Sequence, residues 1–151
     1  MDKTQLRQLI VETLKGADLF SEAAVELLMG TAAQESALGR YIYQINGPAL
    51  GIFQMEPDTH ADIYQNYLAY RPELKRTAQS VSVKNGVAAD EMSWNLKYAI
   101  VMARIHYLRV PKALPDRSDV EAMAHYWKRY YNSEDGAGTV EEFIRNHKRY
   151  L

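Results

Sequence analysis

The chain contains no cysteine among its 151 residues. Disulfide frameworks, thiolate metal sites and cysteine nucleophiles are therefore excluded. Neither sign of charge is in excess, because 18 basic residues stand against 19 acidic ones and the formal net charge is −1. A protein whose main task is to grip nucleic acid carries a strong positive balance. We therefore expect no nucleic-acid partner.

Long hydrophobic runs are also missing. No apolar stretch approaches the ~20 residues that a membrane-spanning helix needs, so we expect no membrane span. The segment 4–15 instead predicts an amphipathic helix, capped by Thr4 and ended by Gly16, and not a signal peptide. Its apolar residues recur at helical spacing: Leu6, Leu9, Ile10 and Leu14. We expect synthesis in the cytoplasm without a signal peptide.

The same spacing predicts helices along most of the chain, over 22–39 (with Ser21 as N-cap), 57–69, 72–79, 90–109, 119–131 and 140–151. The segment 90–109 is apolar on most sides and should be the central helix. Residues 40–56 lack the helical pattern and contain Asn46-Gly47, which favours a short hairpin or an ordered loop. The fold class predicted is all-α, as one compact domain of about seven helices over residues 1–151.

Glu35 is the candidate catalytic residue. On the predicted helix 22–39 it continues an apolar stripe through Ala24, Leu28 and Ala32, and it lies near the negative end of the helix dipole. Both surroundings disfavour the ionised carboxylate, so the pKa of Glu35 should rise. A carboxylic acid that is still protonated near neutral pH can protonate a glycosidic oxygen. A solvated glutamate at a helix end has the same local sequence, so Glu35 alone does not establish a site.

A second group of candidate residues follows in the non-helical segment. Gly51 would let the backbone approach a ligand closely. Phe53 could pack under the carboxyl group and exclude water, and Gln54 offers a donor and an acceptor to an N-acetyl or hydroxyl group. Pro57 is placed to start the next helix. The alternative is a hairpin strand that contains an incidental glutamine.

Glu35-Ser36, followed by Gly51-Ile52-Phe53-Gln54 and then by Met55-Glu56-Pro57-Asp58-Thr59, resembles the soluble lytic transglycosylase family of the lysozyme-like superfamily. These runs are similar to that family's glutamate-serine, G-L-M-Q and P-x-T signatures. Asn95-Leu96, with Ala103 and Tyr107-Leu108, is similar to its third motif at a longer spacing, and Tyr131-Asn132 to its tyrosine-asparagine signature. The likeness spans about residues 25–150.

The resemblance implies a lysozyme-like fold with Glu35 as the catalytic acid and base. It also implies substrate-binding roles for Ser36, Gly51, Phe53, Gln54, Tyr126, Tyr131 and Asn132. The family tyrosine that contacts the catalytic carboxyl matches either Tyr126 or Tyr131. Residues five apart on a regular helix project about 140° from each other, so only one of the two should face the groove.

The implied substrate is the peptidoglycan glycan strand, and the implied reaction is cleavage between N-acetylmuramic acid and N-acetylglucosamine with closure of a 1,6-anhydro ring. One carboxyl group is enough for this reaction, whereas lysozyme-type hydrolysis would need a second, for which Glu56, Asp58 and Asp62 are available. A non-catalytic virion structural protein with a lysozyme-like fold is a further alternative.

A wall-cleaving domain of this kind suits a bacteriophage. We expect it to act on the periplasmic cell wall, either as an endolysin released through a holin lesion or together with phage virion or tail partners. The net charge of −1 favours the virion role. No cofactor is expected, and the four histidines show no paired spacing that would predict a metal site.

Overall fold

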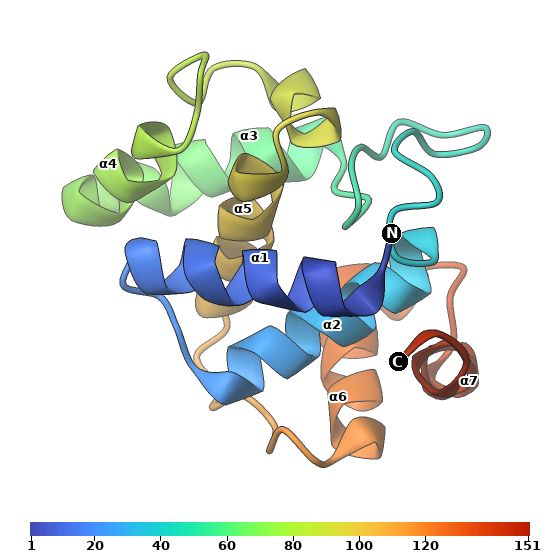
Figure 1. Ribbon diagram of the computed structural model, residues 1–151. Helices are drawn as coiled ribbons and strands as arrows, with labels where there is room; N and C mark the ends of the chain where they lie inside the picture. Colours follow the sequence, from blue (N-terminus) through green and yellow to red (C-terminus); the bar gives the residue numbers. More distant parts are fainter.

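The computed structural model describes residues 1–151, and its regular structure is almost entirely helical (Figure 1). The prediction of an all-α fold is confirmed. The α-helices are α1 (Lys3–Gly16), α2 (Glu22–Ser36), α3 (Pro57–Asn66), α4 (Pro72–Ser80), α5 (Leu96–Leu108), α6 (Val120–Trp127) and α7 (Val140–Tyr150). Two short 3-10 helices, η1 (Leu68–Tyr70) and η2 (Ala89–Ser93), and one π-helix, η3 (Lys128–Asn132), complete the fold. None of these helices is both long and apolar enough to cross a lipid bilayer.

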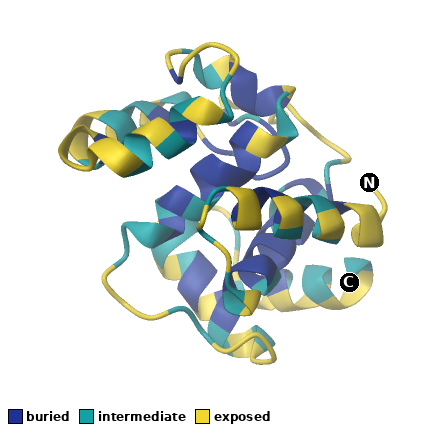
Figure 2. Ribbon diagram, turned by 60° about the vertical axis from the view of Figure 1, so that its left-hand side comes forward, coloured by how far each residue is buried: buried dark blue, intermediate teal, exposed yellow.

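Helix α5 runs through the middle of the molecule, as its apolar sequence predicts (Figure 2). Every residue from Tyr98 to Ala103 is buried, as are Ile105 and Tyr107. Helices α1, α2, α3 and α4 all contact α5. One cluster of 31 buried apolar residues includes side chains from all seven α-helices, so the chain folds as one domain around one core.

Helix α5 begins at Leu96 and not at residue 90, which corrects the predicted span 90–109. Residues 89–93 form η2, and Asn95 then caps α5 by accepting a hydrogen bond from the backbone N–H of Tyr98 at 3.1 Å. An asparagine side chain that binds nearby backbone favours a helix start over a helix interior. Apolar residues therefore keep their helical spacing through residues 90–95 although the α-helix starts only at Leu96, so the spacing does not reveal where α5 begins.

The connection before α5 is held by a buried carboxylate. Glu91 is 0% exposed and accepts four hydrogen bonds of 2.6–2.9 Å, from Ser82 Oγ, Val83 N, Lys84 N and Asn95 Nδ2. Burial acts to raise the pKa of Glu91, but the hydrogen bonds outweigh it and the pKa lies below its ordinary value. The carboxylate therefore ties the loop after α4 to the start of α5.

The first helix is capped by a different residue from the one predicted. The Asp2 carboxylate accepts hydrogen bonds from the backbone N–H groups of Thr4 and Gln5 at 2.9 and 3.0 Å, so Asp2 is the N-cap and Thr4 is not. The carboxylate also suits the positive end of the helix dipole. The prediction for α2 is confirmed, because Ser21 Oγ accepts from the backbone N–H of Ala24.

Helix α2 ends at Ser36, before the predicted end at Gly39. Ala37 and Leu38 adopt left-handed backbone angles, with φ of 50° and 58°. Ser36 Oγ accepts a hydrogen bond from Gly39 N at 2.8 Å and donates one to the carbonyl of Ile52 at 2.6 Å. The turn is therefore closed by a side chain, and Glu35 lies in the last turn of α2.

The segment between α2 and α3 is an ordered loop, one of the two alternatives predicted. It contains only two isolated antiparallel bridges, Tyr43 with Leu50 and Leu50 with Met55. Asn46 turns the chain with φ of 60°. Helix α3 then starts with Pro57 in its first turn, as predicted.

The predicted helix over 119–131 changes its geometry partway. Helix α6 ends at Trp127, and residues 128–132 continue as the π-helix η3. A π-turn carries an extra residue and rotates everything that follows it. The 140° separation expected for Tyr126 and Tyr131 on a regular helix therefore does not apply.

Replacing Glu91 with alanine should lower the free energy of unfolding by about 3 kcal/mol, because four partly buried hydrogen bonds to its carboxylate are lost and each contributes ~0.5–1.5 kcal/mol. Chemical denaturation at pH 7 would measure the loss. The contribution should be complete above the unfolded pKa of a glutamate and should vanish as pH falls through the lower pKa of the folded state.

The matched control is Asp90→Ala. The Asp90 carboxylate is exposed and lies 3.7 Å from the Lys84 ammonium, and such surface pairs contribute ~0–1 kcal/mol. Equal losses for the two variants would show that the buried network does not hold this connection.

Candidate active site

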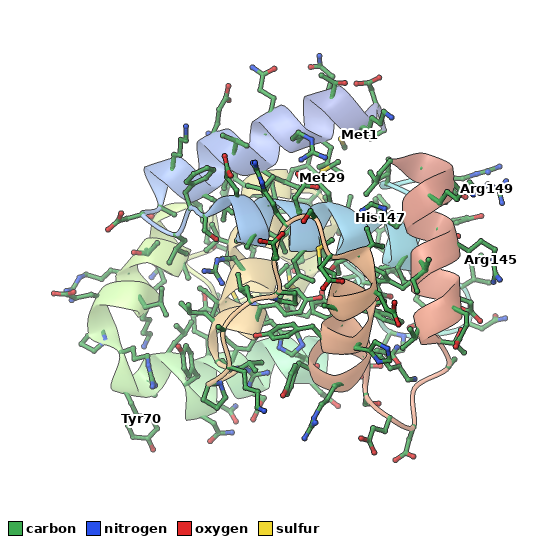
Figure 3. All side chains as sticks on the ribbon, turned by 90° about the horizontal axis from the view of Figure 1, so that it is seen from below. Met1, Met29, Tyr70, Arg145, His147 and Arg149 are labelled. Atoms are coloured by element: carbon green, nitrogen blue, oxygen red, sulfur yellow. The ribbon has the colours of Figure 1, made fainter.

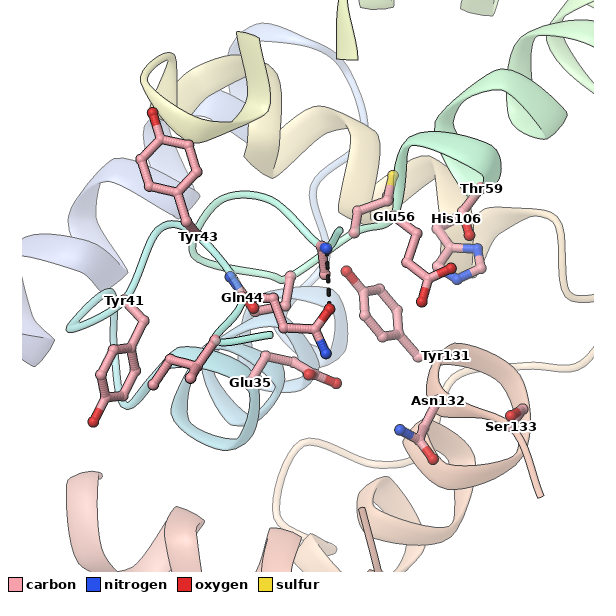
Figure 4. Close-up of a pocket in the computed structure, with 14 residues that line it drawn as sticks. Glu35, Tyr41, Tyr43, Gln44, Glu56, Thr59, His106, Tyr131, Asn132 and Ser133 are labelled. Atoms are coloured by element: carbon pink, nitrogen blue, oxygen red, sulfur yellow. Dashed lines mark hydrogen bonds between the residues drawn. The ribbon is translucent and has the colours of Figure 1, made fainter. Parts of the chain in front are cut away.

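A cavity of about 510 Å³ opens between the end of α2, the loop 40–56, the start of α3 and η3 (Figure 4). Glu35 lies on one side of it and Glu56 on the other. Amide and hydroxyl groups line much of the remaining wall, from Gln44, Gln54, Thr59, Asn132 and Ser133. The other lining residues are aromatic, apolar or imidazole side chains: Tyr41, Tyr43, Ile45, Ala49, Met55, His106 and Tyr131.

Glu35 occupies the position that the sequence predicts. It projects from the last turn of α2 into the cavity and is half-buried. Burial raises the pKa of Glu35 to about 7, while a hydrogen bond from Trp127 opposes the rise. The carboxyl group therefore keeps its proton over much of the range below neutral pH, which is the state that a general acid requires.

Trp127 is the partner of Glu35, a role that was not predicted from the sequence. Its indole Nε1 donates a hydrogen bond to Glu35 Oε1 at 2.9 Å, and its side chain is 0% exposed. The Phe143 ring of α7 packs against the indole with centroids 5.5 Å apart. Gly138 leaves room for the indole, because a Cβ there would lie 2.6 Å from the ring. In the sequence, Trp127 has the helical spacing of any aromatic residue of the core. Its neighbours in sequence therefore do not indicate its contact with Glu35.

Tyr131 faces the cavity, and Tyr126 does not. The Tyr131 hydroxyl donates to the carbonyl of Phe53 at 2.7 Å, so it binds the loop 40–56 to η3. Burial, together with the neighbouring charge of Glu35, raises the pKa of Tyr131 well above its usual value and keeps the hydroxyl neutral. The Tyr126 hydroxyl instead donates to the carbonyl of Lys112 at 3.0 Å, outside the cavity lining.

Asn132, the other half of the predicted tyrosine-asparagine pair, lines the cavity beside Tyr131 (Figure 4). Its Oδ1 accepts a hydrogen bond from Lys128 Nζ at 2.9 Å. That contact fixes the orientation of the amide and leaves its NH₂ group as the donor toward the cavity. Both residues reach the cavity from the π-helix, which agrees with the frequent occurrence of such turns at functional sites.

Three of the predicted substrate-binding residues have structural positions instead. Ser36 is 0% exposed and binds Ile52 and Gly39, and Phe53 is 1% exposed. Gly51 has a left-handed φ of 79°, and a Cβ there would overlap the carbonyl of Met92. These residues shape the loop 40–56 from behind and do not line the cavity, because the close backbone approach at Gly51 is to the protein itself.

Gln54 does line the cavity, as predicted. Its backbone is left-handed, with φ of 48°, and its Nε2 donates to the carbonyl of Gly51 at 2.9 Å. This internal hydrogen bond fixes the side chain, and the amide oxygen forms no hydrogen bond within the protein. The loop therefore presents a preorganised acceptor to the cavity.

His106 lines the cavity beside Glu56 and Thr59 (Figure 4). Burial lowers the pKa of His106 to about 4, with the Arg109 charge acting in the same direction. Arg109 donates to His106 Nδ1 at 2.9 Å and pairs with Asp62 at 2.6 Å. The imidazole is therefore neutral at physiological pH. No three histidine, aspartate or glutamate side chains converge as a metal site would require.

The cost of the raised pKa should be measurable as a pH-dependent stability. The folded pKa of Glu35 is about 7, whereas the ordinary pKa of a glutamate is 4.5. The folded state therefore binds the proton more tightly and loses stability as pH rises from about 4.5 through 7. A shift of this size corresponds to about 3 kcal/mol. Glu35→Gln should therefore gain about 3 kcal/mol over the native chain between pH 4.5 and pH 8, measured by denaturant unfolding.

Glu134→Gln is the matched change of charge at an exposed loop position, and it should not reproduce this gain. A Glu35→Gln variant whose advantage is the same at both pH values would contradict the burial of an ionisable group at this position.

Removing the indole N–H tests the partner of Glu35. Trp127→Phe deletes a donor that stabilises the carboxylate, so the pKa of Glu35 should rise above 7, by about 1 unit for a hydrogen bond to a charged group. An NMR titration of the glutamate carboxyl carbons would follow the change. A pKa that falls or stays constant would show that the 2.9 Å contact does not act on the proton.

Comparison of the chain with models of known protein families, with curated proteins and with solved structures finds no match. The geometry of the site itself therefore indicates its chemistry. That geometry combines a protonated, half-buried carboxyl group with a cavity of amide, hydroxyl and aromatic groups.

Proposed function

We propose that this protein cleaves the β-1,4 bond between N-acetylmuramic acid and N-acetylglucosamine in peptidoglycan, by a lytic transglycosylase mechanism. The observation that carries the proposal is Glu35, whose pKa of about 7 and position in the cavity suit a general acid. The resemblance of Glu35-Ser36 and of residues 51–59 to the soluble lytic transglycosylases supports the same substrate.

The lining of the cavity is suited to a neutral sugar polymer. Amides such as Gln54 and Asn132 can bind acetamido and hydroxyl groups. Tyr41 and Tyr43 stand on the wall opposite η3, and their rings offer flat apolar surfaces to pyranose faces (Figure 4). Tyr43 is 61% exposed, so a ligand can reach its ring without rearrangement of the core.

In the proposed reaction Glu35 first donates its proton to the glycosidic oxygen as the bond from that oxygen to the anomeric carbon breaks. The acetamido oxygen of the muramic acid residue supplies the electron pair that stabilises the anomeric carbon. The Glu35 carboxylate then takes the proton of the 6-hydroxyl group while the 6-oxygen bonds to that carbon and closes the 1,6-anhydro ring. The acetamido oxygen leaves the carbon in the same step and takes back its electron pair. One carboxyl group serves as acid and then as base, and no water is consumed.

Lysozyme-type hydrolysis is the second candidate, and one observation favours it. Of the three acidic residues considered for a second carboxylate, Glu56 lines the cavity, whereas Asp58 does not and Asp62 pairs with Arg109. A carboxylate opposite Glu35 could position water as a general base. The two reactions leave different chain ends, which distinguishes them.

Glu35→Gln should reduce the release of soluble fragments from purified peptidoglycan by about 10²- to 10⁴-fold, because the glutamine has no proton to donate. In the native chain the rate should fall as pH rises through about 7, where Glu35 loses its proton. Circular dichroism would establish that the variant is folded.

Mass spectrometry of the products completes the test. Fragments with 1,6-anhydro ends support the transglycosylase, and reducing ends support the hydrolase. A native chain that releases no fragments at any pH would contradict both enzymes and favour the non-catalytic virion protein.

A further inference from the structure

The cavity is lined by carboxyl groups but by no cation. Its lining includes Glu35 and Glu56, and neither a lysine nor an arginine. The one titratable base in the lining, His106, is neutral because burial lowers its pKa to about 4. The charged or ionisable side chains of the lining, apart from the neutral His106 and the tyrosines, are therefore all acidic.

Two cations that hydrogen-bond to residues of the lining are also held by other groups. Arg109 pairs with Asp62 at 2.6 Å and donates to His106 at 2.9 Å. Lys128 donates to Asn132 Oδ1 at 2.9 Å and to the carbonyls of Gly136 and Gly138 at 2.9 and 2.6 Å. Neither side chain lines the cavity, so neither can pair directly with an anionic ligand there.

Glu56 is a carboxylate without a protein partner. It is exposed, it takes part in none of the four salt bridges, and its side chain does not cap α3 although it occupies the N-cap position. Figure 4 shows its carboxylate directed into the cavity, across from Glu35. Glu56 therefore presents an unpaired carboxyl group to whatever the cavity binds.

We propose, on the basis of the proposed function, that Glu56 is a specificity-determining residue that recognises free amino groups on the glycan strand. Its ligand would be a glucosamine unit that lacks its N-acetyl group and carries an ammonium ion. An ammonium ion forms a charge-assisted hydrogen bond with a carboxylate. The same charge disfavours strands whose muramic acid carboxyl groups are free, because like charges repel.

The expected effect is modest, since Glu56 is exposed and exposed ion pairs are weak. An ammonium ion on the ligand should tighten binding by about 5-fold, which is the upper part of the range for such pairs. The gain should decrease as salt is added, because salt screens exposed charges.

Binding can be measured without turnover in the Glu35→Gln background, which also removes the other carboxyl group of the cavity. The probes are a hexamer of N-acetylglucosamine and the same hexamer with part of its N-acetyl groups removed. Titration calorimetry at about pH 5.5 keeps the amines protonated and exposed carboxylates ionised. The amino hexamer should bind about 5-fold more tightly than the acetylated one.

Adding Glu56→Gln should abolish the preference, so that the two hexamers bind with equal affinity. Asp58→Asn is the matched control, because it removes the same charge from an exposed position two residues away that does not line the cavity. The preference should persist in that control.

Three outcomes separate the claims. Equal binding of both hexamers, or a preference that survives Glu56→Gln, would overturn the role of Glu56 and leave the proposed function standing. A preference lost equally in the Asp58→Asn control would show a general field and not recognition by Glu56. If neither hexamer binds to any variant, the glycan-cleaving function fails, and the role of Glu56 fails with it.

Discussion

The interaction on which the site depends is the hydrogen bond between the Trp127 indole and the half-buried Glu35 carboxyl group. A neutral donor orients the acid without supplying the positive charge that would strip its proton. The indole is held in turn by Phe143 of α7, which itself packs over Gly30 of α2, where a Cβ would lie 2.6 Å from its ring. Helix α7 does not line the cavity, yet its Phe143 packs against Trp127, the residue that donates a hydrogen bond to Glu35. Figure 3 shows that Arg145 and Arg149 of α7 point outward, away from the rest of the molecule.

Glu35 and Ser36, which are adjacent at the end of α2, have different roles in the site. Successive residues on a helix project about 100° apart, so Glu35 can enter the cavity while Ser36 points into the protein. Ser36 binds the carbonyl of Ile52 and thereby fixes the loop 40–56 relative to the acid. Tyr131 fixes the same loop from the other side through the carbonyl of Phe53. The cavity therefore has its shape because the hydroxyl groups of Ser36 and Tyr131 hold the loop 40–56 between α2 and η3.

The sequence predicts those features that repeat or that have local causes. Apolar spacing identifies α5 as the central helix, Ser21 as a cap is recognisable from its type, and Glu35 stands out because an acid continues an apolar stripe. The predictions fail where one side chain binds a distant part of the chain. The hydrogen bond of Ser36 to Ile52, the carbonyl of Met92 against Gly51 and the indole of Trp127 all join residues far apart in sequence. The change to a π-helix after Trp127 is likewise not predictable, because the spacing of apolar residues there fits a regular α-helix equally well.

One electrostatic condition connects the chemistry of the site with its proposed selectivity. A lysine or arginine beside Glu35 would lower its pKa by about 1–3 units and remove the acid at neutral pH. Cations are accordingly absent from the lining, and Arg109 and Lys128 are held by other partners nearby. The remaining charge is that of Glu56, so the requirement to keep a proton on Glu35 also makes the cavity receptive to cationic ligands. A ligand ammonium ion at Glu35 itself would lower the pKa that the proposed catalysis needs. Recognition of an amino group is therefore compatible with the proposed acid catalysis only on the Glu56 side of the cavity, across from Glu35.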